Sequence, residues 1–133
     1  MKKKHTLVLL LLFVLLLGGT GCSQNDKTQA KEEQFTATVE TEIKKKANKY
    51  TEKEFQTADV PLNDFVQLTG EITRSDGDET LKKGDRFILK SGSSNYQIFN
   101  EQEYPFSIGD RVTVYGEYYG FIKAIAIEKE ESK

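Results

Sequence analysis

The sequence predicts a mainly β protein, with one small five-stranded Greek-key barrel preceded by an amphipathic helix. Three observations lead to this fold class. Apolar residues occur in five short strand-like runs between residues 65 and 128. Turn residues separate these runs, and the longest connection lies between the third and the fourth. The 133 residues are enough for one domain and not comfortably for two. An open α+β sheet is the main alternative.

Residues 1–21 are typical of a cleaved secretory signal peptide. Lys2, Lys3 and Lys4 give a positive start, and an unbroken apolar run follows from Leu7 to Leu17. Small residues then lead to Cys22. The apolar run reaches only about 16 Å as a helix, which is short of the roughly 20 residues that span a bilayer. An uncleaved membrane anchor is the alternative interpretation.

The residues Gly19-Thr20-Gly21-Cys22 resemble the lipobox of bacterial lipoproteins, although Gly19 stands where that motif usually has leucine. The resemblance implies that the Cys22 thiol receives a diacylglycerol and becomes the N-terminus after cleavage. Acyl chains such as palmitate would then anchor the protein at the extracytoplasmic face of the cell membrane, at about 0.8 kcal/mol for each buried CH₂ group. Lipidation would also account for the single cysteine, which has no disulfide partner.

The segment after the lipid site is predicted to be a disordered tether as far as residue 34, because it is almost entirely polar. Residues 35–60 are predicted to form an amphipathic helix over about 35–55 and a connection up to Pro61. The basic cluster Lys44–Lys46 faces either anionic lipid headgroups or, as the neighbouring glutamates favour, solvent. The apolar positions at helical spacing are Phe35, Val39, Ile43, Ala47 and Tyr50.

Five predicted strands fill residues 61–128. The first shows the alternation most clearly, because Val66, Leu68 and Ile72 are apolar with polar residues between them. Gly70 interrupts this strand and marks a bulge or a sharp bend. The charged tail 129–133 is expected to fray. The other strands cover Phe87–Leu89, Tyr96–Phe99, Arg111–Gly116 and about Phe121–Glu128.

Residues Val66–Ile72 (VQLTGEI) and Ile108–Glu117 (IGDRVTVYGE) resemble the OB-fold superfamily. Within it they are most similar to exported bacterial OB-fold proteins and to tRNA-anticodon-domain-like lipoproteins. The resemblance covers about half of the chain, from Phe65 to Glu128. It implies a closed barrel that binds oligonucleotides or oligosaccharides across its second and third strands and the flanking loops. On that face we expect the residues Arg86, Ile88, Lys90, Tyr96 and Phe99. The favoured alternative for the aromatic residues Phe87, Tyr96 and Phe99 is that they belong to the barrel core.

The sequence predicts no enzyme, no cofactor and no metal site. His5, the only histidine, lies in the signal peptide, and Cys22, the only cysteine, is the lipidation site. The mature chain therefore has no residues for a Ser-His-Asp or Cys-His arrangement or for a zinc site. The acidic loop at Asp76, Asp78 and Glu79 lacks the twelve-residue calcium-binding pattern, so we interpret it as a solvated turn.

Charge argues against nucleic acid as the natural ligand. The chain has a formal charge of −2, and cleavage of the signal peptide would remove Lys2, Lys3 and Lys4 without removing an acid. Affinity for nucleic acid rests largely on neutralisation of phosphates by lysine and arginine. We therefore do not favour a nucleic-acid partner.

A second aromatic group surrounds the predicted turn between the fourth and fifth strands. Tyr115, Tyr118, Tyr119 and Phe121 either fill the barrel core or form an exposed patch for a partner. The leading hypothesis is a membrane-anchored, non-catalytic binding module for a protein or envelope component, with an accessory, envelope-maintenance or surface-exclusion role. The second hypothesis is an oligosaccharide- or oligonucleotide-binding OB domain.

Overall fold

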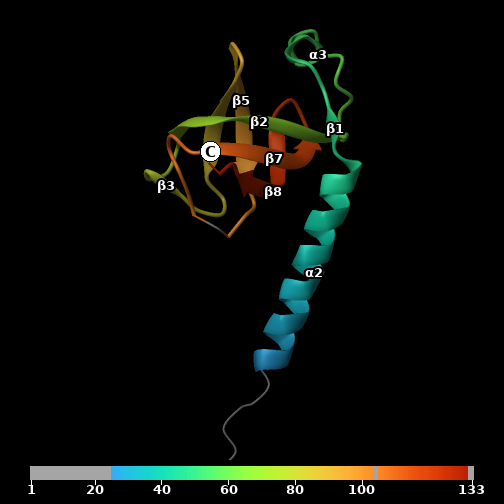
Figure 1. The fold of residues 1–133 in the computed structure, drawn as a ribbon, viewed down its shortest axis with the longest axis vertical. Coiled ribbons are helices and arrows are strands. Elements are labelled where there is room, and N and C mark those ends of the chain that lie inside the picture. The colour runs from blue at the N-terminus through green and yellow to red at the C-terminus, as the bar shows by residue number, and fades with distance from the viewer. Residues whose placement is uncertain (1–24, 104, 132–133) are drawn as a thin grey trace, which may run out of the picture. The chain divides into compact units, whose positions relative to one another are not determined.

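The structure is a computed structural model that describes residues 25–103 and 105–131 (Figure 1). The predicted signal peptide, residues 1–21, and the predicted lipidation site Cys22 lie outside the described residues. The chain divides into two units, residues 1–35 and 36–133, and the barrel belongs to the second. Among the described helices, none is both long enough and apolar enough to cross a membrane.

Helix α2 runs over Asn25–Lys46, so both of its ends differ from the prediction. Residues 25–34, expected as part of a disordered tether, are helical, because lysine, glutamate, glutamine and alanine favour a helix even without an apolar face. The helix ends at Lys46 rather than near residue 55. Its last turns pack on the barrel, since Ile43 is buried with Tyr115 and Ala126.

The connection between α2 and the barrel contains strand β1 (Asn48–Lys49) and the short helix α3 (Glu52–Gln56). A capping box starts α3 as a separate helix. The Thr51 hydroxyl accepts a hydrogen bond from the Glu54 N–H at 3.3 Å, and the Glu54 carboxylate accepts one from the Thr51 N–H at 2.6 Å. The pattern Thr-x-x-Glu therefore divides the long helix that the spacing of apolar residues predicted.

The five long strands form a closed barrel in the order β2-β4-β5-β8-β7, because β2 also pairs with β7, and the two-residue β1 adds beside β2. The pairings are antiparallel except β1–β2 and β5–β8. Strands β3 and β6 form a separate two-stranded sheet. The predicted fold class, a small five-stranded OB-like barrel behind a helix, is confirmed. The strands are β2 (Phe65–Ser75), β3 (Thr80–Leu81), β4 (Arg86–Ser91), β5 (Ser94–Asn100), β6 (Phe106–Ser107), β7 (Arg111–Tyr118) and β8 (Ile122–Lys129).

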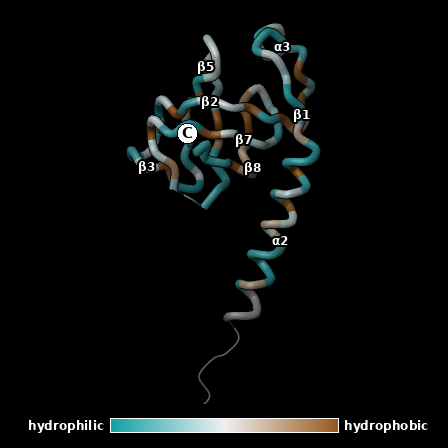
Figure 2. The backbone as a smooth tube through the Cα atoms, in the orientation of Figure 1, coloured by the Kyte–Doolittle hydropathy of each residue, from teal (hydrophilic) through white to brown (hydrophobic). Residues whose placement is uncertain are grey.

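The apolar residues that alternate along the strands form the buried core of the barrel. In Figure 2 hydrophobic and hydrophilic segments accordingly follow one another along the backbone of the strands. Gly70 lies where β2 crosses closely over β4, and a Cβ atom there would stand 2.4 Å from the Lys90 carbonyl oxygen. Only glycine permits this approach. The irregularity of β2 predicted at Gly70 lies instead between Ile72 and Arg74, where the register with β4 shifts. The largest fully buried side chains include Phe87, Ile72, Leu81, Leu89, Ile98 and Ile122.

Candidate functional site

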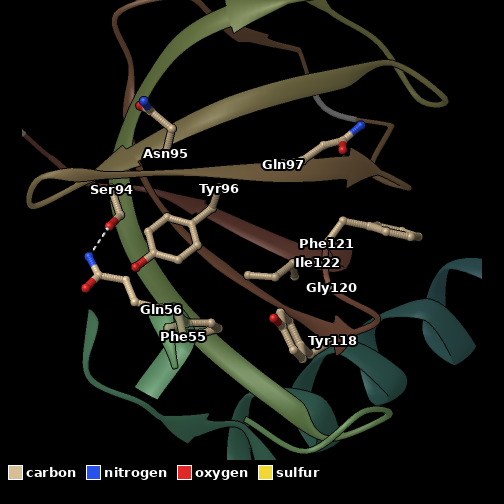
Figure 3. A pocket seen from close by; sticks show the side chains of 10 residues that line it. All are labelled: Phe55, Gln56, Ser94, Asn95, Tyr96, Gln97, Tyr118, Gly120, Phe121 and Ile122. Carbon is tan, nitrogen blue, oxygen red and sulfur yellow. Dashed lines mark hydrogen bonds between the residues drawn. The ribbon is translucent and has the colours of Figure 1, made fainter. Parts of the chain in front are cut away.

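An open cavity of about 230 Å³ lies between α3, the first half of β5 and the turn that joins β7 to β8 (Figure 3). We call it the aromatic cleft. None of its ten described lining residues is charged. The cleft therefore combines aromatic rings with neutral amides and a hydroxyl, a composition suited to an uncharged ligand. Its lining consists of Phe55, Gln56, Ser94, Asn95, Tyr96, Gln97, Tyr118, Gly120, Phe121 and Ile122.

Phe55 is the central ring of the cleft. It makes edge-to-face contacts with Tyr50, Tyr96 and Tyr118, with ring centroids 6.1, 5.1 and 5.5 Å apart. Aromatic pairs prefer this geometry, because the positive edge of one ring meets the negative face of another. The four rings thus hold α3 against the barrel, although α3 has only five residues.

The Glu52 carboxylate ties α3 to the turn between β4 and β5. Its Oε1 atom accepts hydrogen bonds from the Ser93 N–H at 3.1 Å, from the Ser93 hydroxyl at 2.6 Å and from the Ser94 hydroxyl at 2.6 Å. Gln56 adds a hydrogen bond from its Nε2 to the Ser94 Oγ at 2.9 Å (Figure 3). The hydrogen bonds from Ser93 and then Ser94 lower the pKa of Glu52, so it is ionised at neutral pH.

Hydrogen bonds of Asp64 hold the segment before β2 beside the end of β7. The Asp64 carboxylate accepts from the Tyr50 hydroxyl and from the Asn48 side-chain amide, and the Tyr50 bond is the main cause of the lowered pKa of Asp64. The backbone is joined as well. The Tyr118 N–H donates to the Asp64 carbonyl at 3.0 Å, and the Asn63 N–H donates to the Tyr118 carbonyl at 2.8 Å. These contacts fix both Tyr50 and Tyr118 around Phe55.

The rim of the cleft is apolar and exposed. Tyr119 is 39% exposed and Phe121 is 40% exposed, and their ring centroids are 5.9 Å apart. Exposed large apolar side chains that gather beside a cavity are typical of a partner site.

A second surface lies on the outward face of β4 and β5. Across the two strands Arg86 is opposite Phe99, Ile88 is opposite Gln97, and Lys90 is opposite Asn95. A shallow hollow of about 350 Å³ includes part of this face. Its positive charge is partly compensated, because Asp76 lies 3.5 Å from the Arg86 guanidinium and also accepts the Arg86 backbone N–H. The hollow is lined by Arg74, Ser75, Asp76, Arg86, Phe87, Ile88 and Gln97.

The residues predicted for the second and third strands are divided between these two surfaces. Arg86, Lys90 and Phe99 share the outward face of β4 and β5, as the alternation of the strands requires. Tyr96 lies on the other side of β5, in the aromatic cleft (Figure 3). Burial raises the pKa of the Tyr96 hydroxyl, which agrees with this position.

The tyrosines predicted around the last turn are also divided. Tyr118 lines the aromatic cleft and Tyr119 lies on its rim. Tyr115 does not reach either surface, because it is only 9% exposed and packs with Ile43 of α2. Its hydroxyl donates to Glu128 at 3.0 Å. We therefore leave Tyr115 out of the candidate site.

The two charged clusters considered in the sequence form ion pairs within the chain. In the basic cluster, Lys44 lies 2.8 Å from Glu128 and Lys45 lies 3.3 Å from Glu42. In the acidic loop, Asp78 lies 3.6 Å from Lys82. In the part of the chain that the structure describes, no three His, Cys, Asp or Glu residues are grouped so as to hold a metal ion.

The sequence reasoning missed the role of α3. It interpreted Phe55 as the end of an amphipathic helix, whereas Phe55 and Gln56 form one wall of the cleft. The signal that could have identified a separate helix is the capping box at Thr51 and Glu54.

Comparison with known proteins adds little to this description. No protein-family model and no curated protein matches the sequence. Among solved structures, the hypothetical protein YgiW from E. coli is similar, with a TM-score of 0.45 and 15% sequence identity. The match covers 63% of this chain and 89% of that chain. The class of protein is defined by the strand order and the closed sheet: a small OB-like barrel with an aromatic cleft.

Proposed function

We propose that this chain is a membrane-anchored, non-catalytic lipoprotein whose OB-like barrel binds a protein or envelope component outside the cytoplasm. The aromatic cleft carries the proposal. It combines an open cavity, aromatic walls and neutral hydrogen-bonding groups with the exposed rings of Tyr119 and Phe121 at its rim. Binding sites are typically concave and largely apolar, with a few polar groups that orient the ligand.

The anchor is supported by the lipobox-like Gly19-Thr20-Gly21-Cys22 and by the apolar segment before it. Radiolabelled palmitate should enter the wild-type chain in cells and should not enter the Cys22→Ser variant. Equal labelling of the two chains would refute lipidation at Cys22 and, with it, the proposed location.

The binding role is tested by site-specific photo-crosslinking in the native host. A photoreactive benzoylphenylalanine replaces Phe121 at the cleft rim or, as a control, Ile108, an apolar residue that is 45% exposed at the turn before β7. A discrete adduct is expected from position 121 and not from position 108. Equal yields at both positions, or no adduct at position 121, would refute binding at the cleft.

The outward face of β4 and β5 favours a second candidate function, an oligosaccharide- or oligonucleotide-binding domain. There Arg74, Arg86 and Lys90 surround the side chains of Ile88 and Phe99, which could contact phosphates and bases or sugar rings. This candidate predicts that single-stranded oligonucleotides or soluble oligosaccharides bind the chain and that Arg86→Ala weakens them. Oligonucleotide binding should also weaken with added salt.

A further inference from the structure

The barrel closes between β5 and β8 over only a short distance. Strand β5 pairs with β4 from Ser94 to Phe99. On its other side it pairs with β8 at three positions, Ile98 with Ile122, Phe99 with Lys123 and Asn100 with Ala124. Strand β8 begins only at Ile122, because the chain turns through residues 119–121. The first half of β5, residues 94–97, therefore has a neighbouring strand on one side only.

The direction of the backbone groups along β5 follows from its hydrogen bonds. Successive residues of a strand direct their N–H groups to opposite sides. The Asn100 N–H donates to the Asp85 carbonyl on the β4 side at 2.9 Å, and the Glu101 N–H donates to the Ala124 carbonyl of β8 at 3.1 Å. By the same alternation, the N–H groups of Asn95 and Gln97 point away from β4, toward the side where β8 is missing.

These two N–H groups are open in the structure. Asn95 and Gln97 have side chains at the exposed surface. Beyond the β4 and β8 ladders, no hydrogen bond joins either backbone N–H to another of the described residues. Unpaired backbone groups at a sheet edge are a template for another strand.

The aromatic cleft occupies the place that an extended β8 would take. One side of the cleft is residues 94–97 of β5, and the opposite side is Tyr118 and residues 120–122 (Figure 3). Neighbouring strands lie about 4.8 Å apart, and four residues of a strand span about 13 Å. A segment of about four residues therefore matches the open part of the edge.

The lining selects the side chains of such a segment. Side chains of a strand alternate between its two faces. One set would meet the rings of Phe55, Tyr96 and Tyr118, and the other set would lie beside the amides of Asn95 and Gln97 (Figure 3). Because none of the described lining residues is charged, a buried charge on the segment would find no opposite charge among them.

We propose that the partner contributes an extended, uncharged peptide segment that adds as a strand to the open edge of β5 within the aromatic cleft. This proposal rests on the proposed binding function and specifies the chemical class of the partner. Backbone hydrogen bonds to Asn95 and Gln97 provide affinity, and an aromatic or aliphatic side chain against Phe55 provides selectivity.

Hydrogen exchange of single amides tests the proposal in the full chain, purified in mild detergent. In the free protein, the amides of Asn95 and Gln97 should exchange rapidly, whereas Tyr96 and Ile98 on the β4 side should exchange slowly. The probe is a pool of end-capped hexapeptides in which threonine alternates with phenylalanine, tyrosine, leucine or valine. Adding it at millimolar concentration should slow exchange at Asn95 and Gln97 at least about tenfold, which is the effect of forming two new ladder hydrogen bonds.

A matched pair of variants separates the backbone from the side chain. Gln97→Pro removes the N–H that faces the cleft and leaves the backbone hydrogen bonds to β4 in place. It should therefore abolish binding of the peptide pool. Gln97→Ala keeps that N–H and should retain binding. The same peptides with N-methylated alternate amides should not protect the edge, and this control needs no variant to fold.

The outcomes distinguish the two proposals. Unchanged exchange at Asn95 and Gln97, or equal protection by the N-methylated peptides, would overturn strand addition. If the adduct from position 121 persists in that case, the cleft binds its partner in another way: it contacts a protein through side chains alone, or its partner is a glycan. If that adduct is also missing, the binding function itself is refuted.

Discussion

Truncation of Phe55 should destabilise the barrel measurably, although Phe55 belongs to a five-residue helix. Replacing a fully buried phenylalanine by alanine costs about 3–5 kcal/mol. Phe55 is half-buried and contacts Tyr50, Tyr96 and Tyr118. We therefore expect Phe55→Ala to lower the free energy of unfolding by about half that amount, roughly 2 kcal/mol.

Thermal unfolding followed by circular dichroism measures this loss. For a domain of this size about 1 kcal/mol corresponds to 4–8 °C, so Tm should fall by about 8–16 °C. Phe121→Ala is the matched control, because Phe121 is a 40% exposed phenylalanine on the rim of the same cleft, and it should cost less than about 0.5 kcal/mol. A loss for Phe55→Ala as small as that for Phe121→Ala would show that α3 does not pack on the barrel in solution.

Three further changes test the backbone and the attachment of α3. Gly116→Ala should lower the free energy of unfolding in urea by more than about 2 kcal/mol, because its Cβ would lie 2.1 Å from the Lys123 carbonyl oxygen; a near-neutral effect would contradict the close approach of β7 and β8. Ala58→Gly should raise the free energy of unfolding by about 0.5–1 kcal/mol, since Ala58 has a φ of 58°, which favours glycine. A destabilised variant would contradict that backbone conformation. The lowered pKa of Glu52 means that its contribution to stability is present above the unfolded-state value of about 4.5 and is lost as pH falls through the lower folded-state pKa. The urea midpoint of unfolding should therefore fall less in Glu52→Gln than in the wild type as pH is lowered from neutral through the folded-state pKa of Glu52. An identical pH dependence of the two midpoints would contradict the stabilising role of the Glu52 hydrogen bonds.

The barrel could be predicted because its signals are local. Val66 and Ile72 alternate with polar residues in a strand that has one buried face, and that pattern needs no knowledge of the neighbouring strands. Gly70 is similar, because a glycine within a strand pattern usually marks a bend or a close backbone approach. The five long strands and the long connection between the third and the fourth predicted a Greek-key barrel, whereas the two-residue strands β1, β3 and β6 carry no such local pattern.

The candidate site could be predicted only in part, because it depends on which elements cover which face. Residues 112–116 of β7 are all buried, since one face meets the barrel core and the other includes Tyr115 beneath α2. Nothing in the local pattern distinguishes this tyrosine from Tyr119, which is exposed. The position of Phe55 against Tyr96 likewise depends on a contact between residues 41 positions apart in the sequence.

The cleft and the open strand edge arise from one geometric cause. The turn at residues 119–121 ends the β7–β8 hairpin early, and Gly120, with a φ of 84°, permits that turn. Strand β8 therefore starts beside Ile98 and leaves residues 94–97 without a second neighbour. The apolar end of the barrel then needs a cover, and Phe55 on α3 supplies it. One wall of the cleft is strand β5, the second is the turn of the β7–β8 hairpin, and the third is a short helix held by Phe55 and Glu52. Adjustment to a ligand should therefore occur through α3, while β5 keeps a fixed edge.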